Sequence, residues 1–181
     1  GGDYYDFIPR HDGKMLIALG DVSGKGTAAA LLMSSLHAAI HAQTAAKSSL
    51  LEMVKSVNEY LAFNTPSNRF ITFFVAELDP TNGELNYINA GHNPPLVIRT
   101  NGQVQELESG GFPLGIMPMA DFELGKIQLH EGESVIVFSD GVNEAENSDG
   151  EEYGMERFKE VVKNNASRSA AGLRDKIESS V

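Results

Sequence analysis

The sequence predicts an α+β fold, in which helices pack against mainly antiparallel sheet. Three observations predict it: two long helical segments early in the chain, strand-turn-strand patterns through its middle, and a helical tail. Asn82-Gly83 and Asn101-Gly102 are typical of tight turns between antiparallel strands. Helices grouped at both ends of a chain, with strands between them, favour this class over alternating β-α-β units.

Each expected element follows from a local pattern. Residues 14–19 form a short apolar run bounded by glycines, which predicts a strand. Helices are expected over 27–43, which contains no Gly or Pro, and over 49–63, whose apolar residues recur at helical spacing. Residues 1–3 are expected in a turn. The later elements are expected as strands within 70–78, 85–91, 94–107, 122–129 and 133–140, and as a helical tail from about Met155.

Length and composition limit the classes of partner. A chain of 181 residues is expected to form a single domain, residues 1–181. Its formal charge of −11 opposes binding to nucleic acid or to an anionic membrane. The absence of cysteine excludes disulfides, thiolate nucleophiles and cysteine-based zinc sites. Because no apolar stretch is long enough to cross a membrane, we expect a cytoplasmic protein or the cytoplasmic domain of a larger, membrane-attached one.

The stretch GDVSGKG, residues 20–26, admits two chemical interpretations. Glycines and a lysine between a strand and a helix resemble a nucleotide phosphate loop. That loop needs four residues between its first glycine and Gly-Lys, followed by Ser or Thr. Here Gly20 and Gly24 enclose three residues, and Lys25 is followed by Gly26. The spacing therefore disfavours a nucleotide site and leaves Lys25 as a solvated loop residue.

Three aspartates favour the second interpretation, a metal site. Asp3, Asp21 and Asp140 occur in GGDYYD, GDVSGKG and VIVFSDG, and the last two each follow an apolar run and precede a flexible turn. Carboxylates gathered at one place repel one another unless a cation keeps them ionised. Oxygen ligands suit Mg²⁺ or Mn²⁺ better than zinc or copper. The alternative is that each aspartate caps the helix or turn that follows it.

Three histidines and an acidic stretch carry weaker hypotheses. His37 and His41 are four residues apart on the expected first helix and could share a metal, but the sequence offers no third ligand beside them. Polar surface or core positions are therefore the preferred interpretation. His92, in NAGHNPPL, is expected to make a structural hydrogen bond. ENSDGEEYGME resembles an EF-hand loop but has Ala145 at the first ligand position, so a turn leading into a helix is favoured.

Six segments together carry a resemblance to a known family. They are, in order, GGDYYDF, GDVSGKG, FITFFVAELD, NAGHNPPL, GFPLGI and FSDGVNEAENSDGEEYG. Over essentially the whole chain they resemble the metal-dependent protein phosphatases (PPM, or type 2C), in the bacterial SpoIIE/RsbU branch. The resemblance implies an αββα sandwich of two mainly antiparallel sheets flanked by helices. It also implies hydrolysis of phosphoserine or phosphothreonine on a protein, in this branch a phosphorylated anti-sigma-factor antagonist of the STAS type.

The same resemblance assigns roles to particular residues. Asp3, Asp21 and Asp140 match the family's metal-binding aspartates, and Val22 matches a position whose backbone carbonyl joins the first coordination shell. Two ions, Mn²⁺ or Mg²⁺, are implied, with Asp21 and Asp140 central to catalysis. Such a pair lowers the pKa of a bridging water and neutralises phosphoryl oxygens, so that hydroxide attacks phosphorus in line.

The chain departs from the family pattern at several places. Ser23 stands where type 2C enzymes outside this branch carry histidine, and Asn143 replaces an expected threonine. The family's last metal aspartate lies in an Asp-Asp-x-Thr strand, which no segment after Glu160 matches; Asp175 has a helical, charged context. We therefore expect the domain to be truncated at both ends, which calls the second metal site and the activity of this fragment into question.

An alternative function and several partners follow from these expectations. The alternative is a catalytically impaired PPM-like module that binds or regulates other proteins. For an active enzyme, the expected partners are a phosphorylated protein substrate and an N-terminal sensor or receiver domain in the full-length protein. The small residues 28–30 permit close packing of such a domain on the first long helix. A homodimer is also compatible with the sequence, whereas no nucleic-acid partner is expected.

Overall fold

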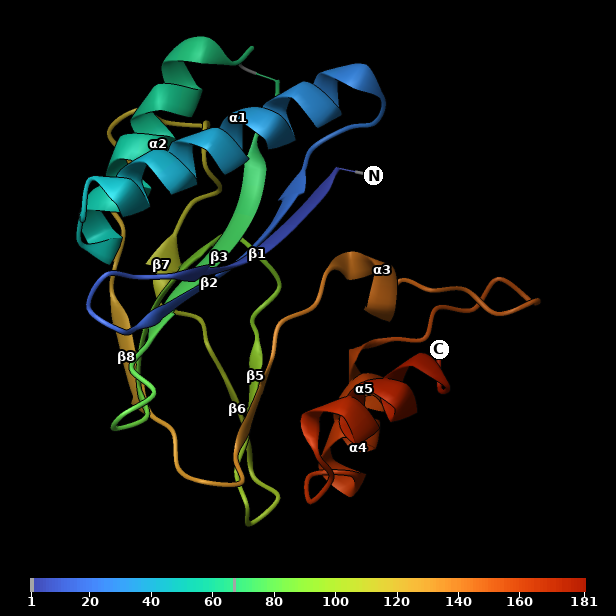
Figure 1. Cartoon of the computed structure of the whole chain (residues 1–181). Coiled ribbons are helices and arrows are strands. Elements are labelled where there is room, and N and C mark those ends of the chain that lie inside the picture. Colours follow the sequence, from blue (N-terminus) through green and yellow to red (C-terminus); the bar gives the residue numbers. More distant parts are fainter. Residues whose placement is uncertain (1, 67) are drawn as a thin grey trace. The chain divides into compact units, whose positions relative to one another are not determined.

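Two sheets of different size organise the chain, as the computed structural model shows for residues 2–66 and 68–181 (Figure 1). Each sheet belongs to a separate compact unit. The first unit runs through His92 and resumes over Glu108–Gln128, and the second comprises Asn93–Leu107 and Leu129–Val181. The first unit contains β1 (Asp3–Pro9), β2 (Met15–Val22), α1 (Thr27–Ala45), α2 (Leu50–Asn64), β3 (Ile71–Leu78), β4 (Glu84–Ala90), β7 (Gly110–Gly111) and β8 (Gly125–Gln128).

The sheet of the first unit is an antiparallel meander with two short additions. Strands β1, β2, β3 and β4 pair in sequence order, β8 pairs antiparallel with β4, and β7 pairs parallel with β4. The register is continuous from Asp3 opposite Asp21 to Pro9 opposite Met15. The β7 strand lies very close to β4. A Cβ built on Gly110 would lie 1.8 Å from the Asn89 carbonyl oxygen, so only glycine fits there.

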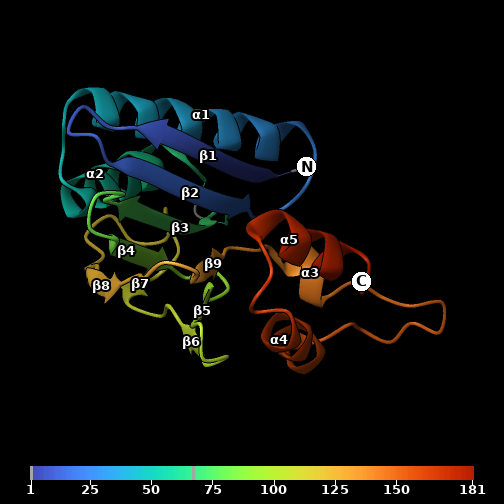
Figure 2. The same cartoon turned by 60° about the horizontal axis from the view of Figure 1, so that its bottom comes forward.

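Helices α1 and α2 cover one face of this sheet (Figure 2). Alternate residues of β2 are buried, as the two-residue period of a strand requires, and Leu16, Ala18 and Val22 join the core beneath the helices. Leu36 of α1 and Val54 of α2 are fully buried in the same core. The other set of alternate residues in β2, Ile17, Leu19 and Asp21, therefore projects from the face opposite α1 and α2.

The second unit has a smaller sheet and its own core. Strand β5 (Leu96–Ile98) lies between β6 (Val104–Glu106) and β9 (Ser134–Ile136), both antiparallel to it. The unit also contains α3 (Asp140–Asn143), α4 (Met155–Asn164) and α5 (Ala170–Glu178). Phe138 and Phe158 pack with ring centroids 4.6 Å apart at the centre of this core.

The expected class and most elements are confirmed, with two corrections. Both Asn-Gly turns connect antiparallel strands, and their glycines have positive φ. The turn expected at residues 1–3 is wrong for Asp3, which begins β1; Gly1 lies outside the described residues. The strand expected over 133–140 ends at Ile136, and Asp140 instead begins α3. Within the described residues, no helix is both long and apolar enough to cross a membrane.

Candidate functional site

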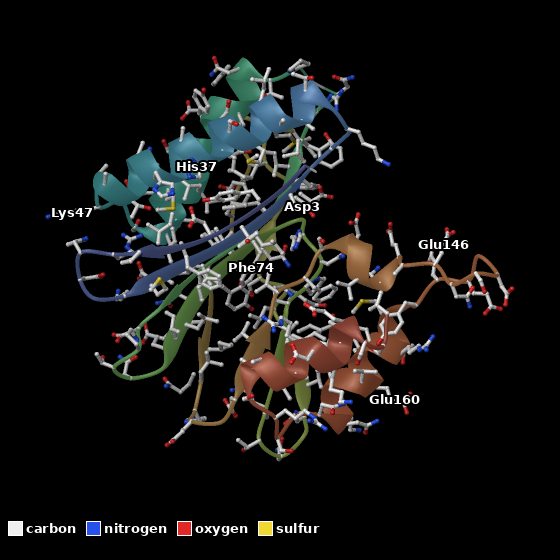
Figure 3. All side chains as sticks on the ribbon, turned by 45° about the vertical axis from the view of Figure 1, so that its right-hand side comes forward. Asp3, His37, Lys47, Phe74, Glu146 and Glu160 are labelled. Carbon is white, nitrogen blue, oxygen red and sulfur yellow. The ribbon has the colours of Figure 1, made fainter. Side chains whose placement is uncertain are left out.

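Asp3 and Asp21 form the centre of the candidate site in the first unit. They are direct partners across the antiparallel β1–β2 pair. Figure 3 labels Asp3, which stands at the start of β1. Directly opposite residues of such a pair share one face of the sheet, with Cβ atoms about 4.5–5.5 Å apart, and like charges there are destabilising. A cation between the two carboxylates would remove that repulsion. Strand register thus brings together two of the three aspartates that the sequence singled out.

The Val22 carbonyl oxygen lies beside this pair, next to a glycine. A Cβ on Gly2 would be 3.1 Å from the Val22 oxygen and 3.6 Å from Asp21 Oδ1. Both oxygens therefore border the small space that the missing side chain of Gly2 leaves open. The donors at this place are carboxylate and carbonyl oxygens, the ligands that Mg²⁺ and Mn²⁺ accept. The residues present fit a hard divalent cation.

Thr72 and His92 extend the polar row that begins with Asp3 and Asp21 on neighbouring strands. Thr72 of β3 is the direct partner of Asp21, on the other side from Asp3. Its Oγ1 lies 3.0 Å from His92 Nδ1, within hydrogen-bonding distance, and the His92 backbone N–H donates to Asn89 Oδ1 at 2.7 Å. His92 is buried. The structural hydrogen bond expected for His92 is confirmed, and its partner stands next to a proposed metal ligand.

The GDVSGKG loop leaves this site in a conformation that only glycine adopts easily. Gly24 and Gly26 have φ of 91° and 82°, in the left-handed region. The Arg69 guanidinium fills the space beside Gly24 and donates from Nη1 to the Ser23 carbonyl at 2.7 Å. Ser23 Oγ accepts the Phe70 backbone N–H at 2.9 Å. The loop is thus fastened to the residues before β3, while Lys25 is exposed, as expected for a solvated lysine.

Asp140 belongs to the second unit and has a different local setting. It is the first residue of α3, after Ser139, which has an extended backbone and makes no side-chain cap bond. In the same unit Asn143, which stands in place of the expected threonine, accepts from Asn93 Nδ2 at 3.3 Å. That Asp140 shares a centre with Asp3 and Asp21 stays a prediction. Asp175 is exposed on α5 and paired with Arg174 at 2.8 Å, which confirms the helical, charged context expected for it.

Sequence reasoning missed Gly2, Arg69 and Thr72. Thr72 is the one polar residue of the segment FITFFVA, residues 70–76, and that break in an apolar run could have indicated it. The roles of Gly2 and Arg69 depend on contacts between segments distant in sequence, Arg69 with Ser23 and Gly2 with Val22. No local pattern predicts such contacts.

Comparison with known proteins identifies a family. The sequence profile described as Stage II sporulation protein E (SpoIIE) matches residues 11–181. Phosphoserine phosphatase RsbU of Bacillus subtilis is 30% identical, with 90% of this chain and 52% of that protein covered. Protein IcfG of Synechocystis is also 30% identical, with 92% of this chain and 30% of that protein covered. The chain therefore spans about half or less of the length of these curated relatives.

Solved structures confirm the fold class. The RsbU and RsbW domains of a Mycobacterium tuberculosis protein match with a TM-score of 0.85 and 29% identity, covering 99% of this chain and 50% of that one. The PP2C phosphatase domain of SpoIIE from Bacillus subtilis, solved with a fragment of its regulatory domain, matches with a TM-score of 0.79. It covers all of this chain and 53% of the other, and at 21% identity it shows the fold alone. The expected α+β architecture of mainly antiparallel sheets and helices is that of the PP2C phosphatases.

Proposed function

Because the chain belongs to the SpoIIE family of PPM-type phosphatases, in the branch that includes RsbU, we propose that it hydrolyses phosphoserine or phosphothreonine in a protein substrate. One observation carries the proposal: Asp3 and Asp21 face each other across β1 and β2, with the Val22 carbonyl beside them. Divalent metal dependence is general among PP2C phosphatases. The paired carboxylates of this chain are the groups that such an ion needs.

The proposed centre uses residues from both units. Asp3, Asp21 and the Val22 carbonyl would hold Mn²⁺ or Mg²⁺, and Asp140 would complete the ligand set. When bound, two such ions supply Lewis acidity and a water of lowered pKa for in-line attack on phosphorus. The chain's own part is to keep the carboxylates in register, to hold Thr72 beside Asp21 through His92, and to fix the loop after Val22 through Arg69. This proposal requires that the two units form one catalytic domain, residues 1–181.

The substrate and partners follow from the relatives. RsbU is named a phosphoserine phosphatase, and the Mycobacterium tuberculosis structure joins RsbU and RsbW domains. These support a phosphorylated STAS-type anti-sigma antagonist as substrate and a sensor or receiver domain as regulator of a longer protein. A cytoplasmic site of action and a homodimer belong to the same proposal.

A catalytically impaired PPM-like module is the second candidate. The observation in its favour is that Asp175 is exposed on α5 and pairs with Arg174 at 2.8 Å, so it is not arranged as a metal ligand. Such a module would bind its partner through the same fold without hydrolysing phosphate.

Phosphate release from a phosphoserine peptide, with and without MnCl₂, separates these candidates in the full-length protein. We expect activity that EDTA abolishes. Asp21→Ala and Asp140→Ala should each lower it by more than about 100-fold, since loss of a ligand's supporting partner alone costs 10- to 100-fold. Asp175→Ala is the matched control and should retain activity.

Two outcomes would contradict the proposed enzyme. Hydrolysis that persists in EDTA, or in both aspartate variants, would rule out the metal centre. A folded full-length protein that binds its partner but releases no phosphate with Mn²⁺ or Mg²⁺ would establish the binding module.

A further inference from the structure

A second cluster of potential metal ligands lies on the opposite face of β1 from Asp3. Asp6 projects from β1 toward α1, where His37 and His41 occupy neighbouring turns of the helix. His41 Nε2 is 2.8 Å from Asp6 Oδ2, and His37 Nε2 is 3.9 Å from the same oxygen. Among the described residues, these three form the one group of three or more His, Asp or Glu side chains whose ligand atoms all lie within 4.8 Å of one another.

The surface position preferred for His37 and His41 from the sequence is confirmed, because both side chains are exposed, and the structure adds a third potential ligand beside them. The histidine pair seemed to lack a third ligand because none is near it along the chain. The third ligand comes from β1, thirty-five residues before His41, and that strand was not predicted. Figure 3 shows His37 on α1, and its ring contacts the Tyr4 ring edge-on at 5.9 Å.

Neighbouring groups orient the Asp6 carboxylate. The Phe7 backbone N–H donates to Oδ1 at 2.8 Å, and the Tyr4 hydroxyl donates to Oδ2 at 3.2 Å. Burial alone raises the pKa of Asp6, but hydrogen bonds from His41, Phe7 and Tyr4 outweigh it and hold this pKa below its ordinary value. Burial and the nearby Asp6 carboxylate raise the pKa of Tyr4, so its hydroxyl stays a donor. Groups of this kind hold the ligands of natural metal sites in position.

We propose that Asp6, His37 and His41 bind one Zn²⁺ ion, at a site separate from the Asp3–Asp21 centre. Two imidazole nitrogens and one carboxylate oxygen are a three-ligand set that zinc accepts, with a fourth position left for water. At metal–ligand distances of about 2.0–2.1 Å, tetrahedral ligands lie about 3.3 Å apart. The two distances to Asp6 lie on either side of this value, so small side-chain rotations suffice.

Access and chemistry distinguish this site from the first one. The side chains of His37, His41 and Asp6 are 53%, 44% and 25% exposed, so an ion can enter without opening the core. Imidazole favours zinc over magnesium and manganese, whose preferred ligands are oxygen atoms. A bound ion would also cross-link α1 to β1, since its ligands come from both elements. The proposal concerns metal binding alone and does not depend on the proposed phosphatase activity.

The test is zinc titration of the protein carrying Asp21→Ala, which removes the oxygen-ligand centre. Isothermal titration with ZnSO₄ should show one site, and Co²⁺ should give the visible absorption of a tetrahedral complex. Replacing His37 or His41 with Gln should weaken zinc binding by at least about tenfold. Loss of a residue that only supports a metal ligand already costs about 10- to 100-fold in metal affinity, and loss of a ligand should cost no less. The matched control is the double variant His11→Gln/His130→Gln, at two exposed histidines, which should bind normally.

A second measurement covers variants that fold poorly. The chain has five histidines, so imidazole NMR resonances of the protein without histidine substitutions can be followed as zinc is added. Two resonances should shift together at one equivalent. Three results would overturn the site: failure of the protein to bind zinc, zinc binding by His37→Gln or His41→Gln as tight as in the parent protein, or zinc-induced shifts at other histidines. Because the Asp21→Ala background is expected to be inactive, none of these outcomes bears on the phosphatase proposal.

Discussion

The two faces of β1 carry two carboxylates with opposite surroundings. Asp3 faces another carboxylate, Asp21, whereas Asp6 faces two imidazoles. The first arrangement comes from the register of paired strands, and the second from the spacing of histidines on a helix packed over the strand. The comparison teaches that one strand can present two kinds of metal ligand set, because alternate residues meet different elements. In the two proposed sites, oxygen ligands would suit Mg²⁺ or Mn²⁺ on one face, and imidazoles would favour zinc on the other.

Thr72→Val gives the largest expected effect among variants outside the proposed ligands. It keeps the shape of the side chain but removes the hydroxyl that pairs with His92 beside Asp21. Loss of a group that supports a ligand costs about 10- to 100-fold, so we expect kcat/KM for Mn²⁺-dependent phosphate release to fall in that range. Thr72→Ser should restore most of the activity, and zinc binding at Asp6 should not change. Unaltered kinetics in Thr72→Val would show that the polar row does not support the centre.

Gly2→Ala should have a smaller effect on the same face. Its added Cβ would meet the Val22 carbonyl oxygen at 3.1 Å, which requires a shift of a few tenths of an ångström. Because a misplacement of 1 Å costs about 100-fold, we expect roughly a tenfold loss of kcat and weaker activation by Mn²⁺. Gly172→Ala, whose Cβ would make an ordinary 3.4 Å contact on α5, is the control. Equal activity of the two variants would mean that the space beside Gly2 is not part of the centre.

Ser49→Ala tests the helix-covered face and should affect stability alone. Ser49 and Glu52 form a reciprocal capping box at the start of α2, with the Ser49 N–H donating to Glu52 Oε2 at 2.9 Å. Loss of the cap should lower Tm by about 2–4 °C without changing kcat. Ser34→Ala, in the middle of α1, is the control. A change in kcat at constant Mn²⁺ would show that the helix-covered face influences catalysis as well as stability.

The same capping box gives a pH dependence of known sign. Hydrogen bonds from the Ser49 side chain and backbone lower the pKa of Glu52 from its ordinary value of 4.5. A carboxyl whose pKa is lower in the folded state stabilises the folded protein at pH values above its unfolded-state pKa. That stabilisation is lost as the pH falls through the folded-state pKa. The difference in Tm between the parent protein and Ser49→Ala should therefore narrow below about pH 4.5. Thermal melts between pH 7 and pH 3 measure it.

Local patterns predicted the elements better than their pairing. The hairpins and both long helices follow from turn residues and apolar spacing, and the choice of Asp21 as a candidate ligand follows from its place at the end of an apolar strand. The β1 strand was missed because Asp3, Asp6 and Pro9 have low strand propensity, and pairing with β2 overrides it. With β1 missed, neither the partner of Asp21 nor the third ligand beside His37 could be found.

Asp140 shows a different limit. Its apolar run predicted a strand end, yet β9 stops at Ile136 and a four-residue helix begins at the aspartate. Aspartate is common both after strands and in the first turn of helices, so the residue type alone does not decide between them. The three-dimensional partners of Thr72 and Arg69 are likewise set by register and loop packing.

The close approach of β7 to β4 restricts where this protein can be altered. Gly110 has no functional group, yet any side chain there would collide with Asn89, whose amide oxygen accepts from His92. His92 in turn pairs with Thr72, the neighbour of Asp21. A library of variants screened for activity should therefore show intolerance at a residue that touches neither metal nor substrate. For an engineer, the edge glycine is as poor a place for a label or a linker as the aspartates themselves.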